Sequence, residues 1–130
     1  MDKRRFKSAA WALVASAAIV GLAGCGGDSS NAPNPGITPN STITIVPGAF
    51  NKGMAAFSPP SDTVHVGNIV RMHNGDSITH IIQPSTLGGP NWGTISGGGQ
   101  SDFTATAVGT WPYHCTVISH TMSGELVIIP

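Results

Sequence analysis

Turns at short intervals are the feature that most restricts the fold of this chain. From residue 41 on, clusters of Gly, Pro and Asn interrupt the sequence, and no long stretch has a helical period. Between these clusters, short segments alternate apolar and polar residues, as half-buried strands do. Seven such segments lie at 42–46, 63–66, 70–74, 80–82, 103–105, 111–115 and 126–128. They predict an all-β fold, a sandwich of seven or eight strands.

The first 24 residues do not fit this pattern. Four basic residues lie within positions 3–7, an apolar run extends from Ala9 to Ala23, and small residues precede Cys25. This order is typical of a secretory signal peptide at 1–24, and the apolar run is too short for a comfortable membrane span. The sequence Leu22-Ala23-Gly24-Cys25 resembles a bacterial lipobox, which implies cleavage before Cys25 and lipidation of that cysteine. In a plain secretory signal, Cys25 would have no such role.

Residues 25–40 are rich in Gly, Ser, Asn and Pro and contain almost nothing apolar. Such a segment buries too little surface to fold, so we expect a lipidated flexible tether. One small domain at 41–130 would follow it. The lipid would anchor the exported protein to a membrane of the cell envelope, on the periplasmic or outer face.

Cleavage before Cys25 would leave two basic and five acidic residues, a net charge of −3 with neutral histidines. These are Lys52 and Arg71 against Asp28, Asp62, Asp76, Asp102 and Glu125. So few basic residues predict that nucleic acid is not a partner. Lipidation would also leave Cys115 as the single free cysteine, which excludes an internal disulfide. Such a cysteine suggests an intermolecular disulfide, a reactive thiol or a metal ligand.

The sequence around Cys115 favours a metal ligand. Cys115, His120 and Met122 lie within eight residues, and His80 lies upstream, after the sequence Asn-Gly-Asp. Two imidazoles and one thiolate in a plane, with a weak axial thioether, form a blue-copper site. Thiolate and thioether favour Cu(I) while imidazole tolerates Cu(II). We therefore expect one copper ion that cycles between the two states.

Strand alternation separates the remaining histidines from this group. Consecutive residues of a strand point to opposite faces, so if Tyr113 and Cys115 face inward, His114 faces outward. His65 and His73 lie on other strands without neighbours that resemble ligands, and we expect them to be surface histidines.

Over residues 42–130 the chain resembles the cupredoxin family. The resemblance rests on Gly67-x-x-Val70-x-Met72-x-Asn74-x-Asp76-x-x-x-His80-x-Ile82, on Phe103, on the segment from Gly109 to Cys115, and on Met-x-Gly before the last strand. It implies a Greek-key β-sandwich and copper ligands at His80, Cys115 and His120.

The ligand loop departs from the pattern of several cupredoxins. Four residues separate Cys115 from His120, as in azurin-like proteins, whereas plastocyanin- and amicyanin-like proteins have two. A single residue separates His120 from Met122, which is unusually short. We expect Met122 to be the axial ligand. A backbone carbonyl, Glu125 or an empty position are the alternatives.

The function that these features favour is transfer of single electrons between redox partner proteins by a type 1 copper site. A mononuclear copper site that binds or reacts with a small molecule is one alternative, and copper storage or delivery is another. An oxidase is disfavoured because Thr116, and not a second histidine, follows Cys115. We therefore do not expect an enzyme. A structural thiol, a zinc site or a nucleophilic cysteine explains fewer of the residues.

Overall fold

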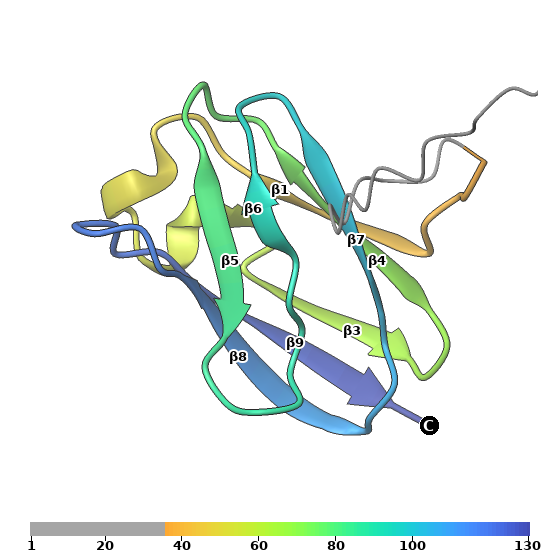
Figure 1. Ribbon diagram of the computed structural model, residues 1–130. Coiled ribbons are helices and arrows are strands. Elements are labelled where there is room, and N and C mark those ends of the chain that lie inside the picture. Colours follow the sequence, from red (N-terminus) through yellow and green to blue (C-terminus); the bar gives the residue numbers. More distant parts are fainter. Residues whose placement is uncertain (1–35) are drawn as a thin grey trace, which may run out of the picture.

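Alternation of apolar and polar residues produces the strands of the molecule. In β1 (Ser41–Ile45) the side chains of Ile43 and Ile45 are buried, and in β4 (Ile69–Asn74) those of Val70 and Met72 are buried. The computed structural model describes residues 36–130. Within this part of the chain, nine strands form two sheets that pack face to face (Figure 1).

The first sheet has the strand order β2-β1-β4-β7 and the second has the order β3-β9-β8-β5-β6. In the first sheet, β2 spans Phe57–Ser58 and β7 spans Gln100–Thr104. In the second sheet, the bounds are β3 Ser61–His65, β5 His80–Pro84, β6 Gly93–Ile95, β8 Gly109–Cys115 and β9 Ser123–Ile129. The pairs β1–β4 and β3–β9 are parallel, and the other pairs are antiparallel.

The predicted all-β sandwich is confirmed. All seven segments chosen by their alternation form strands, and the short strands β2 and β6 are additional. The sequence analysis also did not anticipate two 3₁₀ helices between β1 and β2, η1 (Ala49–Asn51) and η2 (Met54–Ala56). They lie at the end of the sandwich where β5 begins and β8 ends (Figure 1).

Aromatic rings fill the centre of the core. Trp92 and Tyr113 are fully buried, and their ring centroids lie 5.0 Å apart in an edge-to-face arrangement. Phe57 and Phe103 extend this cluster at 5.1 Å from Tyr113 and 5.6 Å from Trp92, respectively. Edge-to-face pairs at these separations add to the stabilisation from burial alone. Tyr113 belongs to β8, two residues before Cys115, so the cluster packs against the strand that carries this cysteine.

The packing of Tyr113 also explains the glycine in the sequence Met-x-Gly. Gly124 lies opposite Tyr113 in the β8–β9 pair, and the tyrosine ring crosses it. A Cβ atom at Gly124 would lie 2.5 Å from the Tyr113 hydroxyl oxygen, a separation that real structures do not show. The glycine therefore makes room for the ring.

The start of the described segment contacts the first sheet. The amide of Asn40 donates to the carbonyl of Ile69, and Arg71 donates to the carbonyl of Ile37. The predicted signal peptide, the lipidation of Cys25 and the tether up to residue 35 lie outside the described residues. Within residues 36–130, none of the helices has the length and apolar character required to cross a membrane.

Candidate metal centre

Two neighbouring strands and one loop bring three predicted ligands together. Cys115 ends β8 and lies opposite Ile82 of β5, while His80 begins β5 two residues away on the same face. The loop after β8 returns His120 to this point. The Sγ atom of Cys115 lies 3.8 Å from Nδ1 of His80 and 3.4 Å from Nδ1 of His120. All three ligand atoms lie within 4.8 Å of one another.

This donor set fits a single metal ion. Ligand atoms that share an ion through bonds of about 2.0–2.3 Å lie about 3.5–4 Å apart at trigonal angles. The two sulfur–nitrogen distances agree with this spacing. Each imidazole directs the same kind of atom, Nδ1, at the sulfur. One thiolate and two imidazoles in this arrangement are the strong ligands of a blue-copper site.

His80 is held from behind by a carboxylate. Its side chain is fully buried, and its Nε2 lies 3.0 Å from Oδ2 of Asp76, four residues earlier. A carboxylate can only accept here, so the hydrogen of the neutral imidazole lies on Nε2. Nδ1 is then bare and faces the sulfur of Cys115.

Backbone amides keep Asp76 ionised in its buried position. Burial alone would raise the pKa of Asp76, but hydrogen bonds from the amide of Gly48, the His80 ring and the amides of Ser77 and Ala49 together lower it to about 2. The Ala49 amide lies 3.3 Å from Oδ2, and the Ser77 amide lies 2.8 Å from Oδ1. Asp76 therefore connects His80 to the loop that carries η1.

Asn74 fixes the turn that positions Asp76. Its Oδ1 accepts from the amide of Asp76 at 2.9 Å, while its Nδ2 donates to the carbonyls of Ile78 and Ile95. The side chain is fully buried, and these three bonds satisfy its polar atoms. The sequence Asn-x-Asp before His80 therefore forms a hydrogen-bonded turn, in which Asn74 orients Asp76.

The surroundings of His120 are more open. His120 is partly exposed, and its ring centroid lies 6.2 Å from that of Phe50. The amide of Thr121 donates to the carbonyl of Phe50, which attaches the ligand loop to η1. Ser119, just before the ligand, has a left-handed φ of 68°, so the loop turns sharply there.

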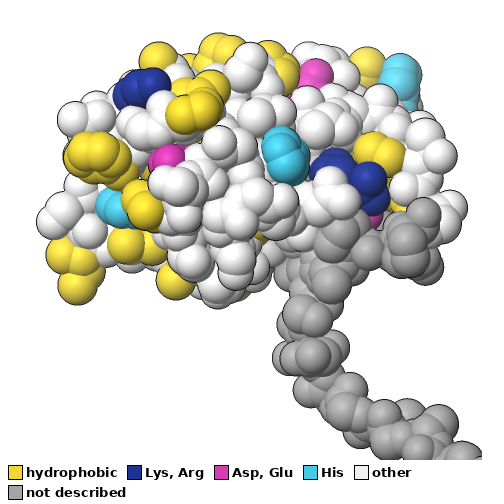
Figure 2. Space-filling view, turned by 90° about the horizontal axis from the view of Figure 1, so that it is seen from above, with side chains coloured by type: hydrophobic (Ala, Val, Ile, Leu, Met, Phe, Trp, Pro, Cys, Tyr) yellow, Lys and Arg dark blue, Asp and Glu magenta, His cyan; other side chains and the backbone are white. Residues whose placement is uncertain are grey.

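Exposed apolar side chains lie in the loop that carries His120 and in the two 3₁₀ helices next to it. Phe50, Met54 and Ile118, which we call the apolar rim, are 45%, 53% and 91% exposed. Figure 2 shows hydrophobic side chains gathered at the left of the molecule, the end where these loops lie in Figure 1.

Met122 and Glu125 occupy different faces of the strand pair. The amide of Cys115 donates to the carbonyl of Met122, which extends the β8–β9 ladder by one step. By alternation, Met122 shares the buried face of Cys115 and Gly124, and its side chain is 2% exposed. Glu125 faces the other way and is partly exposed. Met122 therefore stays the predicted axial ligand, and the register does not favour Glu125.

The other histidines lie apart from this group. His114 is on the opposite face of β8 from Cys115, as expected, with Nδ1 2.9 Å from Oγ of Ser85. His65 is exposed and contacts the carbonyl of Pro130, and His73 is partly exposed on β4.

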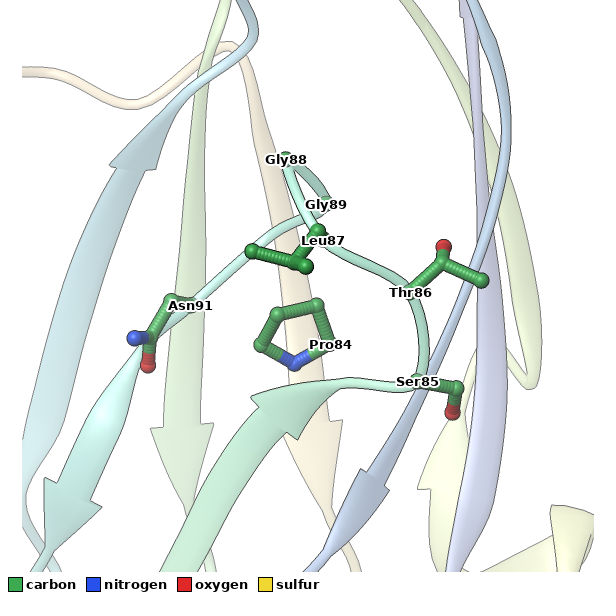
Figure 3. A pocket seen from close by; sticks show the side chains of 7 residues that line it. All are labelled: Pro84, Ser85, Thr86, Leu87, Gly88, Gly89 and Asn91. Atoms are coloured by element: carbon green, nitrogen blue, oxygen red, sulfur yellow. The ribbon is translucent and has the colours of Figure 1, made fainter.

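A surface hollow also lies away from the centre. Its lining residues are Pro84, Ser85, Thr86, Leu87, Gly88, Gly89 and Asn91 (Figure 3). These residues follow the end of β5, whereas His80 begins that strand, and none of their side chains titrates near neutral pH. The hollow therefore contributes nothing to the metal centre.

Two parts of the site were missed by the sequence analysis. Asp76 belongs to the motif that resembles cupredoxins, and its position four residues before His80 is the signal that could assign it a role. Phe50 and its loop gave no local signal, because their proximity to His120 depends on how the sandwich closes.

Comparisons with known proteins support the fold. No protein-family model and no curated protein sequence matches the chain. Solved structures do match. A purple cupredoxin from Nitrosopumilus maritimus is similar at 24% identity, with a TM-score of 0.59, over 69% of this chain and 100% of that one. Oxidised plastocyanin from Dryopteris crassirhizoma has 19% identity and a TM-score of 0.52, over 68% of this chain and 99% of that one.

An enzyme contains a similar domain. The copper-containing nitrite reductase from Thermus scotoductus has 20% identity and a TM-score of 0.56 over 72% of this chain, but the match covers only 23% of that enzyme. The described part of this chain therefore has the cupredoxin fold, and its His-Cys-His group lies where it can hold a metal ion.

Proposed function

We propose that this chain is a type 1 copper protein that carries single electrons between redox partner proteins at the cell envelope. The observation that carries the proposal is the cluster of His80, Cys115 and His120, whose ligand atoms lie within 4.8 Å of one another in a cupredoxin fold. The ion supplies one-electron redox chemistry through the Cu(II)/Cu(I) couple. The chain supplies a fixed ligand set that suits both oxidation states.

Burial favours an electron carrier over a site for substrates. Cys115 is 5% exposed and His80 is fully buried, so only the His120 side of the group reaches the surface. The surface hollow at residues 84–91 lies at the other end of β5. A redox partner needs only to approach His120, whereas a substrate would need space at the ligands.

The direct test is the visible spectrum of the purified protein loaded with one equivalent of Cu(II). An intense band is expected, because a cysteine thiolate bound to Cu(II) gives strong charge transfer. Cys115→Ser should abolish the band. His114→Ala should leave it nearly unchanged, since that side chain faces Ser85. A colourless wild-type complex, or a Cys115→Ser complex that keeps its colour, would refute the proposed function.

The apolar rim is the proposed docking surface for redox partners. Phe50 lies 6.2 Å from His120, Ile118 lies two residues before it, and the domain has few charged side chains to steer an encounter. Ile118→Lys should slow electron self-exchange between oxidised and reduced copies, measured by NMR line broadening. Leu87→Lys is the matched control, since Leu87 is fully exposed in the loop after β5. Equal rates in the two variants would place docking elsewhere.

We also propose that the lipid on Cys25 holds the protein at a membrane. The sequence Leu22-Ala23-Gly24-Cys25 supports this proposal. Cys25→Ser should move the protein from the membrane fraction to the soluble fraction. A variant that still sediments with membranes after a salt wash would show that another anchor exists.

A further inference from the structure

The carboxylate of Asp76, in the turn after β4, contacts the ring of the predicted ligand His80. It is buried, it accepts a hydrogen bond from Nε2 of His80 at 3.0 Å, and backbone amides donate to both of its oxygens. Metal-bound histidines commonly donate their second N–H group to such a partner, which fixes the ring and its tautomer. In this chain the partner is a full negative charge, directly behind the most buried predicted ligand.

Within residues 36–130, no lysine or arginine forms an ion pair with this carboxylate. Residues 36–130 contain two basic side chains, Lys52 and Arg71. Arg71 forms an ion pair with Asp102 at 2.7 Å, and Lys52 donates to the carbonyl of Pro47. The dipoles of the backbone amides stabilise Asp76, but they leave its net charge in place. A metal ion held by Nδ1 of His80 would therefore place a positive charge on the other side of the imidazole ring from Asp76.

Resting on the proposed function, we propose that Asp76 is a positioning residue that holds Nδ1 of His80 bare and directed at the metal and that lowers the reduction potential of the centre. A buried negative charge stabilises Cu(II) more than Cu(I), because the attraction grows with the charge of the ion. The same carboxylate accepts a hydrogen bond from the amide of Ala49. It therefore also holds in place the loop that carries Phe50, whose ring lies near His120.

The first test uses the metal-free wild-type protein and needs no substitution. Long-range ¹H–¹⁵N NMR spectra distinguish the two tautomers of a neutral histidine. In the neutral ring of His80 the proton should lie on Nε2, with Nδ1 unprotonated. A proton on Nδ1 would overturn the proposal, whatever metal the protein binds.

The second test compares Asp76→Asn with Asp102→Asn. Both variants lose one negative charge, but Asp102 pairs with Arg71 on the first sheet and touches none of the ligands. Asp76→Asn should weaken Cu(II) binding roughly 10–100-fold, the usual loss when such a partner is removed, and Cu(I) binding less. Its potential should therefore become more positive. Asp102→Asn should keep the wild-type potential, and Asp76→Glu, which retains the charge, should recover part of the shift.

The outcomes separate this proposal from the proposed function. A blue Asp76→Asn protein whose potential equals that of Asp102→Asn would refute the role of Asp76 and leave the electron carrier intact. A wild-type protein without the copper band would refute the proposed function, and the NMR measurement on the metal-free protein would still decide whether Asp76 sets the tautomer of His80.

Discussion

The two histidines of the metal centre lie in opposite environments. The closed side consists of Asn74, Asp76 and His80, all buried and joined by hydrogen bonds to one another or to the backbone. The open side consists of Phe50 and His120, where the ligand is partly exposed beneath a ring that is itself 45% exposed. Cys115 lies between them, at the end of β8.

The difference follows from how each side is built. His80 starts a strand that is paired on both edges, with β6 and β8, so its backbone cannot move without disturbing the sheet. His120 lies in a loop attached through the amide of Thr121 to the carbonyl of Phe50. One ligand is therefore set by the fold and the other by a local contact. An electron carrier benefits from both, since rigidity limits rearrangement and exposure shortens the path to a partner.

The largest expected effect comes from removing each histidine in turn. His80→Gly and His120→Gly should both lose the copper band, because each leaves one imidazole and one thiolate. Added imidazole should restore the band readily in His120→Gly, where the vacancy opens to solvent. It should restore His80→Gly poorly, since that side chain is fully buried. Titration of each variant with imidazole, followed by absorption, measures the difference. Equal rescue would show that the closed side opens in solution.

The sequence was sufficient to predict which face of its strand Cys115 occupies. Alternation placed Cys115 and Tyr113 on one face and His114 on the other, because a strand has a period of two. It also located the strands that carry His80 and Cys115. These are local properties of the chain.

The sequence was not sufficient for the contacts that make the sides different. The ring of Phe50 reaches His120, 70 residues later, only once η1 packs against the ligand loop. The short strand β6 (Gly93–Ile95) was missed because three residues, one of them glycine, carry too little alternation. The contact of Phe50 depends on how the sandwich closes, and β6 depends on its pairing with β5, so neither is encoded by a single segment.

A change in β9, opposite Tyr113 of β8, should destabilise the whole sandwich. Gly124→Ala puts a methyl group 2.5 Å from the Tyr113 hydroxyl oxygen, so the ring or β9 must shift. Overpacking of this kind costs about 1–3 kcal/mol of unfolding free energy. Denaturant unfolding should show this loss, while Ser123→Ala, at the exposed neighbouring position, should be close to wild type. A stable Gly124→Ala protein would mean that Tyr113 has room to move.

A smaller effect is expected at the axial position. Met122 shares the face of Cys115, so Met122→Leu should keep copper bound and raise the potential, because a weak donor to Cu(II) is lost. Glu125→Gln is the matched control on the opposite face of β9. Voltammetry of both variants measures the shift. A silent Met122→Leu and a shifted Glu125→Gln would identify the carboxylate as the ligand and would contradict the register.

The smallest effect should come from removing the cover of the open side. Phe50→Ala deletes a ring that lies 6.2 Å from His120 but leaves the carbonyl that holds Thr121 in place. The ring is already 45% exposed, so the loss of unfolding free energy should be about 1 kcal/mol, below the usual cost of removing a fully buried phenylalanine.

The copper band should not move, since the ligands are unchanged. Copper loss to a chelator should become several-fold faster, because solvent and chelator reach His120 more easily. Met54→Ala, which removes another exposed side chain of the apolar rim, controls for a general loosening of this end. If Phe50→Ala releases copper at the wild-type rate, the ring of Phe50 does not limit access of the chelator to His120.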